Sequence, residues 1–141
     1  MRIEHRFVGL LPDTLEEGVL YISIDYATAE HNCCCGCGHR VVTPLSPSDW
    51  SLTFDGRTVS LHPSIGNWSF PCKSHYWIRK NEIVWGRRFS PVEIEAVRAK
   101  KRATWRNQLS DSEREATLGE GERPGRWRTR VWSRIRRPHK A

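Results

Sequence analysis

Residues 50–61, WSLTFDGRTVSL, carry the clearest local signal in the chain. Two short runs in which apolar and polar residues alternate flank the dipeptide Asp55-Gly56. This dipeptide is the strongest short-range indicator of a hairpin, because both residues tolerate the positive φ angles of a tight turn. The stretch therefore predicts two antiparallel strands joined by a short turn.

Other segments before residue 90 favour the same extended structure. Residues 18–27, GVLYISIDYA, are rich in β-branched and aromatic side chains, as strands usually are. Residues 76–85, YWIRKNEIVW, are typical of a second hairpin with its turn near Lys80-Asn81. With five or six short strands, residues 1–90 are expected to form a mainly β (α+β) domain, a small antiparallel sheet or open barrel.

A helix is predicted after this β domain. Ser90, Pro91 and Glu93 combine an N-cap serine, proline at the first helical position and a glutamate three residues after the cap. Apolar residues then recur at helical spacing as far as Ala103. We expect a C-terminal helix over residues 91–109.

Most of the positive charge lies in the C-terminal part of the chain. The formal net charge is +7, but residues 1–97 hold nine Lys/Arg against eleven Asp/Glu, whereas residues 98–141 hold fourteen against five. Residues 110–141 are predicted to be a basic, flexible tail with a linker at residues 119–125. Residues 126–137 interleave arginine with tryptophan, a composition that suits weak contact with nucleic acid or with an anionic surface. The same residues are equally compatible with a solvated, disordered extension.

The length and composition exclude several classes of protein. A chain of 141 residues, 38% of them hydrophobic, can bury one core but hardly two. Its longest apolar runs are four or five residues, whereas a membrane-spanning helix needs roughly 20. The first residues, MRIEHRF, lack the apolar stretch of a signal peptide. We therefore expect a cytoplasmic protein.

The five cysteines indicate a metal site. Four of them fall within residues 33–37, and Cys72 stands alone. Neighbouring cysteines pair badly as disulfides, so in a reducing compartment this cluster favours zinc, which takes four tetrahedral ligands.

Spacing alone leaves the zinc ligands open. Cys34 and Cys37 have the spacing of a zinc knuckle, and Cys72 and His75 repeat it. A rival set takes the cysteines at alternate positions: Cys33, Cys35 and Cys37. If His75 is a ligand, the site is Cys₃His; if four cysteines close the site, His75 is free for other chemistry.

Three longer stretches resemble a known family. They are residues 33–47, CCCGCGHRVVTPLSP, residues 50–56, WSLTFDG, and residues 60–78, SLHPSIGNWSFPCKSHYWI. They are similar to the BubE family, peptidase-like proteins encoded with bacterial ubiquitin-like conjugation (Bub) operons. The resemblance runs from about Gly18 to Trp85.

The resemblance implies a function and a metal site. The implied function is a deubiquitinase-like serine peptidase that acts on a bacterial ubiquitin-like protein, with E1-like and E2-like enzymes as further partners. The implied ligands of one structural zinc are Cys33, Cys35, Cys37 and Cys72, which leaves Cys34 as a spare thiol. The arginine-rich tail lies outside the resemblance and inherits nothing from it.

Ser64 and His75 are the candidate catalytic residues, and the resemblance carries most of this assignment. Ser64 follows a strand that is expected to end near His62, and the neighbouring proline and glycine would hold it in a tight turn. His75 opens the next strand and, if four cysteines close the zinc site, is free to take the proton of Ser64. A turn serine is otherwise commonly bonded to its own backbone.

Further candidates are second choices: Ser74 as nucleophile, His62 and His39 as bases, and Asn67 or Asp55 as the third member of a triad. Trp68 and Trp77 flank the expected site, where they would either line a groove for an extended protein tail or pack in the core. A metallopeptidase is disfavoured, because the chain has no His-Glu-x-x-His motif and cysteine-rich zinc sites are usually closed. The competing functions are a non-catalytic zinc-binding adaptor or ligase-like module, and a nucleic-acid-binding zinc protein.

Overall fold

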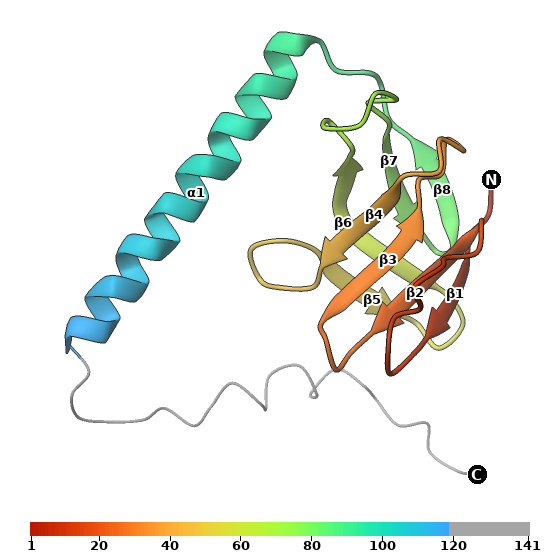
Figure 1. Ribbon diagram of the computed structural model, residues 1–141, viewed down its shortest axis with the longest axis horizontal. Helices are drawn as coiled ribbons and strands as arrows, with labels where there is room; N and C mark the ends of the chain where they lie inside the picture. The colour runs from red at the N-terminus through yellow and green to blue at the C-terminus, as the bar shows by residue number, and fades with distance from the viewer. Residues whose placement is uncertain (119–141) are drawn as a thin grey trace. The chain divides into compact units, whose positions relative to one another are not determined.

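The computed structural model describes residues 1–118. Eight strands precede one helix in this part of the chain (Figure 1). The elements are β1 (Glu4–Phe7), β2 (Val19–Ser23), β3 (Thr28–Asn32), β4 (Arg40–Pro44), β5 (Ser51–Phe54), β6 (Val59–Gly66), β7 (His75–Arg79), β8 (Glu82–Trp85) and α1 (Pro91–Leu118).

The strands form two open four-stranded sheets, in the orders β1-β2-β3-β4 and β5-β6-β7-β8. All neighbouring strands are antiparallel except β1 and β2, which run parallel. The predicted mainly β fold with a C-terminal helix is confirmed, but the expected number of strands was too low. One reason is β3, TAEHN, whose polar sequence gives no strand signal although its three central residues are buried.

Both predicted hairpins are present. Between β5 and β6, Gly56 has a φ of 96°, and the carboxylate of Asp55 accepts hydrogen bonds from the backbone N–H of Arg57 and Thr58. Between β7 and β8, Lys80 and Asn81 have φ angles of 48° and 63°, the two positive values that a tight hairpin turn requires.

The core lies between the two sheets. Leu20 and Ile22 of β2 are fully buried and belong to one apolar cluster with Ile65 of β6 and with Tyr76 and Ile78 of β7. Because successive side chains of a strand point to opposite faces, the residues between these positions point away from the core. The outer face of the β5-β6-β7-β8 sheet therefore carries side chains that do not pack in this core.

Helix α1 begins where it was predicted but ends later. The Ser90 hydroxyl accepts a hydrogen bond from the backbone N–H of Glu93, and the Glu93 carboxylate accepts one from the backbone N–H of Ser90, a reciprocal capping box. The helix continues to Leu118, not 109, so the first nine residues of the expected tail are helical. Residues 110–118 contain no glycine or proline to stop the helix, whereas Gly119 follows directly.

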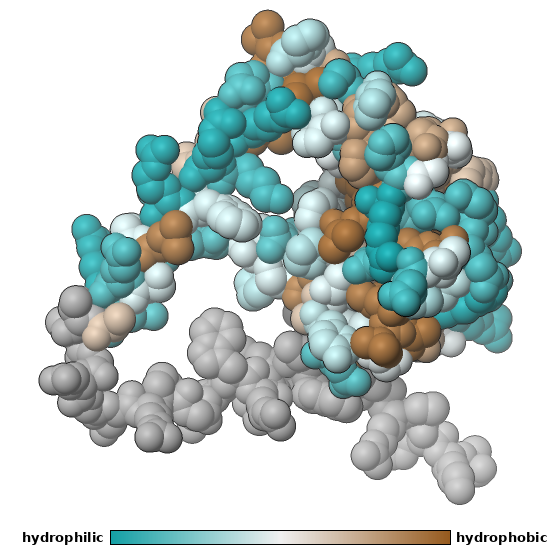
Figure 2. All heavy atoms as spheres, viewed as in Figure 1, coloured by the Kyte–Doolittle hydropathy of each residue, from teal (hydrophilic) through white to brown (hydrophobic). Residues whose placement is uncertain are grey.

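Residues 1–94 form one compact unit, and Ile94, in the first turn of α1, is buried within it. From Glu95 to Ala116 every side chain of the helix is exposed. Figure 2 shows mainly hydrophilic side chains along this part, with scattered apolar ones. The predicted linker at 119–125 and the arginine-rich residues 126–137 lie outside the described residues. Within residues 1–118, no helix is long and apolar enough to cross a membrane.

Candidate active site and metal centre

Ser64 lies within strand β6, which corrects the expectation that it sits in a turn after a strand ending near His62. The strand runs on to Gly66, and its pairing with β7 shifts register between Leu61 and Ile65. Pro63 has no backbone N–H to donate, and proline within a sheet is found at such irregularities. The shift presents Ser64, half-buried, beside β7.

The structure brings Ser64 and His75 together. Nε2 of His75, the first residue of β7, lies 3.0 Å from Oγ of Ser64. The imidazole is largely buried, with 8% of its surface exposed. The two side chains come from positions 11 residues apart on adjacent strands, and their separation is that of a nucleophile hydrogen-bonded to its base.

The other ring nitrogen of His75 faces a backbone acceptor. Nδ1 lies 3.1 Å from the carbonyl oxygen of Arg87, in the segment that leads from β8 to α1. A carbonyl oxygen can only accept, so Nδ1 carries the hydrogen. In the neutral ring Nε2 is then left as an acceptor for the Ser64 hydroxyl, the tautomer that a general base needs.

Aromatic rings surround the imidazole. The ring centroids of Trp68, Trp77 and Phe89 lie 5.3, 5.0 and 4.8 Å from that of His75. Trp68 and Phe89 are stacked on each other at 4.8 Å. Trp68 and Trp77, both half-buried, thus pack against His75 itself. Phe89 adds a third aromatic ring, which was not predicted from the sequence.

The other residues considered for catalysis lie elsewhere. Ser74 is buried with its hydroxyl against the cysteine sulfurs, and His39 contacts the Cys37 sulfur with Nδ1 at 3.2 Å. Asp55 is held in its hairpin turn, where hydrogen bonds from Thr58 lower its pKa to about 2. His62 is exposed on β6. Neither Asp55 nor Asn67 is hydrogen-bonded to His75; the partner of its Nδ1 is the Arg87 carbonyl.

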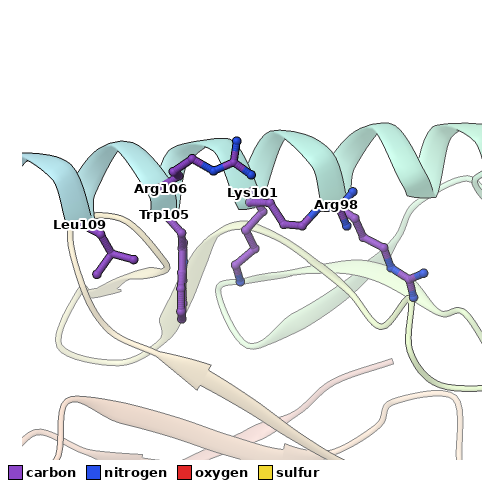
Figure 3. A pocket seen from close by; sticks show the side chains of 6 residues that line it. Arg98, Lys101, Trp105, Arg106 and Leu109 are labelled. Atoms are coloured by element: carbon purple, nitrogen blue, oxygen red, sulfur yellow. The ribbon is translucent and has the colours of Figure 1, made fainter.

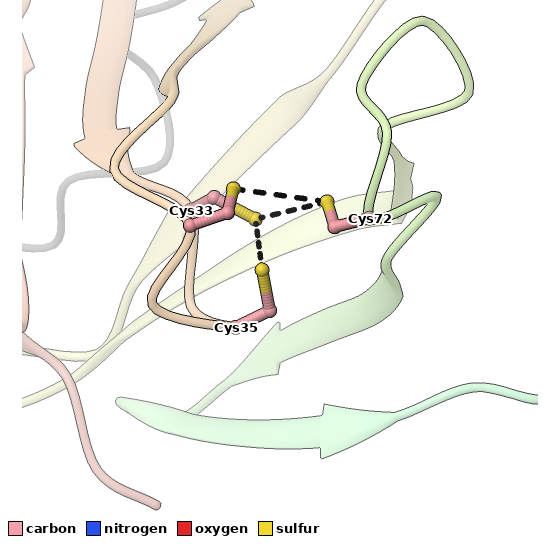
Figure 4. Close-up of side chains that lie close together, drawn as sticks. Cys33, Cys35 and Cys72 are labelled. Atoms are coloured by element: carbon pink, nitrogen blue, oxygen red, sulfur yellow. Dashed lines mark hydrogen bonds between the residues drawn. The ribbon is translucent and has the colours of Figure 1, made fainter.

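Four cysteine sulfurs meet in a single cluster, formed by Cys33, Cys35, Cys37 and Cys72, and all lie within 4.8 Å of one another. Figure 4 shows Cys33 and Cys35 on the loop between β3 and β4, opposite Cys72 on the loop between β6 and β7. Among the residues described, this is the one group of cysteine, histidine or acidic side chains that could hold a metal.

The cluster fits zinc by its donors and its dimensions. Four thiolates form the usual closed structural site, and a Zn–S distance of about 2.3 Å places tetrahedral sulfurs about 3.8 Å apart. Sγ of Cys72 lies 3.9 Å from that of Cys33 and 3.8 Å from that of Cys37. Although burial opposes it, hydrogen bonds from Ser74 lower the pKa of Cys72 to about 7, toward the thiolate that a metal binds.

The alternative ligand set with zinc-knuckle spacing, which includes Cys34 and His75, is not brought together. Cys34 packs in the core, where burial raises the pKa of its thiol to about 11, and His75 is bonded to Ser64 and the Arg87 carbonyl. Both therefore stand outside the cluster, and the imidazole remains available for proton transfer.

Two buried polar side chains support the cluster from behind. The Asn67 amide donates to the Ser74 hydroxyl at 2.8 Å, and that hydroxyl lies 3.1 Å from Sγ of Cys33 and 3.5 Å from Sγ of Cys72. These residues belong to the loop between β6, which contains Ser64, and β7, which begins at His75. A metal held here would fix the loop that connects the strands of Ser64 and His75.

A family model described as bacterial ubiquitination-like system serine protease (BubE) matches residues 7–86, more than half of the chain. The chain belongs to the BubE family. Neither the curated proteins nor the solved structures compared with it gave a match. The BubE match includes Ser64, His75 and all four clustered cysteines, and it ends one residue before Arg87.

The contact of Arg87 with His75 could not be predicted from the types of side chain in the sequence. Its contact with His75 is made by the backbone carbonyl, which every residue type has. Only the folding of the segment after β8 brings it to the BubE site. Gly86 was equally hidden: a Cβ at this position would stand 2.5 Å from Nδ1 of His75.

Proposed function

We propose that this protein is a serine peptidase that processes or deconjugates a bacterial ubiquitin-like protein, with Ser64 as nucleophile and His75 as general base. The observation that carries the proposal is the 3.0 Å contact between Nε2 of His75 and Oγ of Ser64, in a ring whose Nδ1 faces the Arg87 carbonyl. The family description, a serine protease of a bacterial ubiquitination-like system, supports the reaction class and the pathway.

The reaction that follows from this geometry is acyl transfer. Oγ of Ser64 attacks the carbonyl carbon of the scissile bond while its proton passes to Nε2 of His75. The imidazolium, stabilised by its Nδ1–H bond to the Arg87 carbonyl, returns the proton to the leaving group as that bond breaks. Water then loses a proton to the same nitrogen and hydrolyses the ester on Ser64, which restores both residues.

Zinc would be held by Cys33, Cys35, Cys37 and Cys72, where it would cross-link two loops. Four thiolates leave no open coordination position for substrate, so its contribution is structural. Folding and metal binding are coupled in such small sites. The cross-link would affect catalysis by fixing the loop that joins β6 to β7.

The decisive experiment is cleavage of a fusion between a bacterial ubiquitin-like protein and a reporter. We expect Ser64→Ala to abolish cleavage while zinc content and melting temperature stay unchanged, because the hydroxyl contributes little to packing. Ser60→Ala on the same strand is the matched control and should retain activity. Full activity in Ser64→Ala would end the proposal and leave the zinc-binding adaptor as the better account.

His75→Ala separates these two accounts further. If His75 is the base, the variant loses cleavage and keeps zinc. If His75 were instead a zinc ligand, the variant would release the metal and unfold. His62→Ala, an exposed histidine on the neighbouring strand, is the control for loss of an imidazole from this sheet.

A second candidate function, contact with single-stranded nucleic acid, is supported by one face of α1. Side chains at helical spacing gather there, and Figure 3 labels Arg98, Lys101, Trp105, Arg106 and Leu109 along the helix. Arg102 lines the same face. Residues 98–109 contain five Lys/Arg and no Asp or Glu. Phosphates and stacked bases suit this mixture. Apolar and basic residues share this face of α1, whereas a helix that lies in a membrane surface has its apolar and basic residues on opposite faces. The mixture therefore favours nucleic acid over a membrane surface.

A further inference from the structure

The segment that supplies the Arg87 carbonyl is tied to the first turn of α1 by one carboxylate. Oε1 of Glu93 accepts a hydrogen bond of 2.5 Å from the Arg87 guanidinium, and Oε2 accepts a second of 3.1 Å. Oε2 also accepts the backbone N–H of Ser90 at 2.8 Å. Three donors from the segment before the helix thus converge on a single side chain.

We propose that Glu93 is a positioning residue of the candidate active site, which acts by holding the Arg87 carbonyl against Nδ1 of His75. Glu93 touches neither Ser64 nor His75, so its effect passes through the Arg87 backbone. The inference rests on the proposed serine-peptidase function, since it concerns the orientation of the base in that reaction.

The segment is anchored on both sides of the carbonyl. On one side, the backbone N–H of Gly86 donates to the carbonyl of His75 at 2.8 Å. On the other, the Arg87 guanidinium lies 4.7 Å from the centroid of the Phe89 ring, which packs edge-on against the imidazole. Glu93 holds that guanidinium in place over the ring. Without Glu93, the Arg87 side chain keeps only a 3.4 Å hydrogen bond, to the Arg88 carbonyl, within residues 1–118.

Exposure separates this positioning role from a role in stability. The side chains of Arg87 and Glu93 are 67% and 39% exposed, and ion pairs in such surroundings contribute little to the free energy of unfolding. The hydrogen bonds from Arg87 and Ser90 lower the pKa of Glu93 to about 2, so the carboxylate is charged at any pH used for an assay. Loss of the pair should therefore change the rate and leave the melting temperature nearly unchanged.

The test measures how fast a fluorophosphonate probe labels Ser64 in the full chain, because this readout needs no identified substrate. Glu93→Gln keeps a side chain that can cap the Ser90 N–H but removes the charge from Arg87. We expect the maximal labelling rate to fall at least about tenfold, since small misplacements of a catalytic group have large effects. Probe affinity, zinc content and melting temperature should not change.

The matched control is Glu95→Gln, two residues further along α1. Glu95 makes the same kind of exposed pair, with Arg102 at 2.5 Å, but is not hydrogen-bonded to residues 86–90 in the described structure. It should label like the wild type. Arg87→Met, which keeps the backbone carbonyl, should slow labelling as much as Glu93→Gln, and the double variant should be no slower than either single one.

The outcomes separate this inference from the function on which it rests. If the wild type fails to label, or labels elsewhere than at Ser64, the proposed function fails and the inference with it. If Ser64 is labelled in the wild type and Glu93→Gln reacts as fast as Glu95→Gln, the positioning role alone is overturned. A lower melting temperature in Glu93→Gln that accounts for the slower labelling would also overturn it.

Discussion

Gly86 lies directly against the imidazole of His75. A Cβ at residue 86 would stand 2.5 Å from Nδ1 and 2.8 Å from Cε1, closer than atoms of these types approach one another. The hydrogen bond from the Gly86 N–H to the His75 carbonyl holds the two backbones together, so we expect the imidazole to give way by rotating. The glycine therefore makes room for the ring in the orientation that meets Ser64.

We predict that Gly86→Ala lowers cleavage by about 100-fold, the scale of a misplaced catalytic group. The displaced ring loses its contact with Ser64, whereas the cysteine cluster is not touched. Peptidase activity and zinc content measured on the same preparation check this. Gly56→Ala is a useful comparison, because it strains a turn of positive φ without approaching the site.

Replacement of single cysteines should rank them by their place in the structure. Cys72→Ser should release zinc and strongly destabilise the unit of residues 1–94, because Cys72 is the one clustered cysteine on the β6–β7 loop. Cys34→Ser, in the core but outside the cluster, should retain zinc. Metal content by elemental analysis and melting curves with and without chelator measure the difference. The reverse ranking would contradict the four-cysteine site.

Asn67 should link metal affinity to stability. Asn67→Ala removes the amide that donates to the buried Ser74 hydroxyl, at an expected cost of about 1–3 kcal/mol. Support of this kind around metal ligands is worth about 10–100-fold in affinity, so zinc should pass more readily to a competing chelator. Ser69→Ala, at an exposed position of the same loop, is the control. Unchanged zinc retention in Asn67→Ala would show that the amide does not support the ligands.

The basic face of α1 should determine any binding to single-stranded nucleic acid. Replacement of Arg98, Lys101, Arg102 and Arg106 by glutamine should weaken binding to the nucleic acid. The slope of the logarithm of the binding constant against the logarithm of salt concentration should fall by about one for each lost phosphate contact. Lys100→Gln, which lies off this face, should have little effect. Binding isotherms at several salt concentrations measure both. Equal binding by the wild type and the fourfold variant would rule out this face.

Residues 119–141 can be tested separately by truncation. The compact unit ends at residue 94 and the described part of α1 at residue 118. Removal of residues 119–141 should therefore leave folding and peptidase activity intact. Circular dichroism and the cleavage assay provide the check. An unfolded truncated protein would show that the boundary is wrongly placed.

The sequence predicted the features that depend on local patterns. The Asp55-Gly56 and Lys80-Asn81 turns and the Ser90–Glu93 cap are encoded within a few residues, and each is present. Strand β3 could not be predicted, because its buried polar residues Glu30 and His31 have partners outside the local sequence: Arg40 and Tyr76.

The features of the candidate site were likewise predicted only in part. Ser64, His75 and the alternate cysteines were proposed mainly from the family resemblance, and the structure brings each group together. The acceptor at Nδ1 was missed, because the sequence suggested side chains and the fold uses a main-chain oxygen. The turn expected at Ser64 was wrong because pairing with β7 resumes at Ile65 after the shift in register.

The location of Ser64 and His75 on neighbouring strands, on the face turned away from the core, has a consequence for selectivity. Peptidases that recognise short sequences read them in deep pockets, one residue at a time. The proposed nucleophile lies on the outer face of a sheet, beside aromatic rings that pack on the proposed base. This placement is better suited to a folded protein partner, whose surface aligns the bond to be cut. Isolated peptides should then be poor substrates, however well their sequence matches the cleavage point.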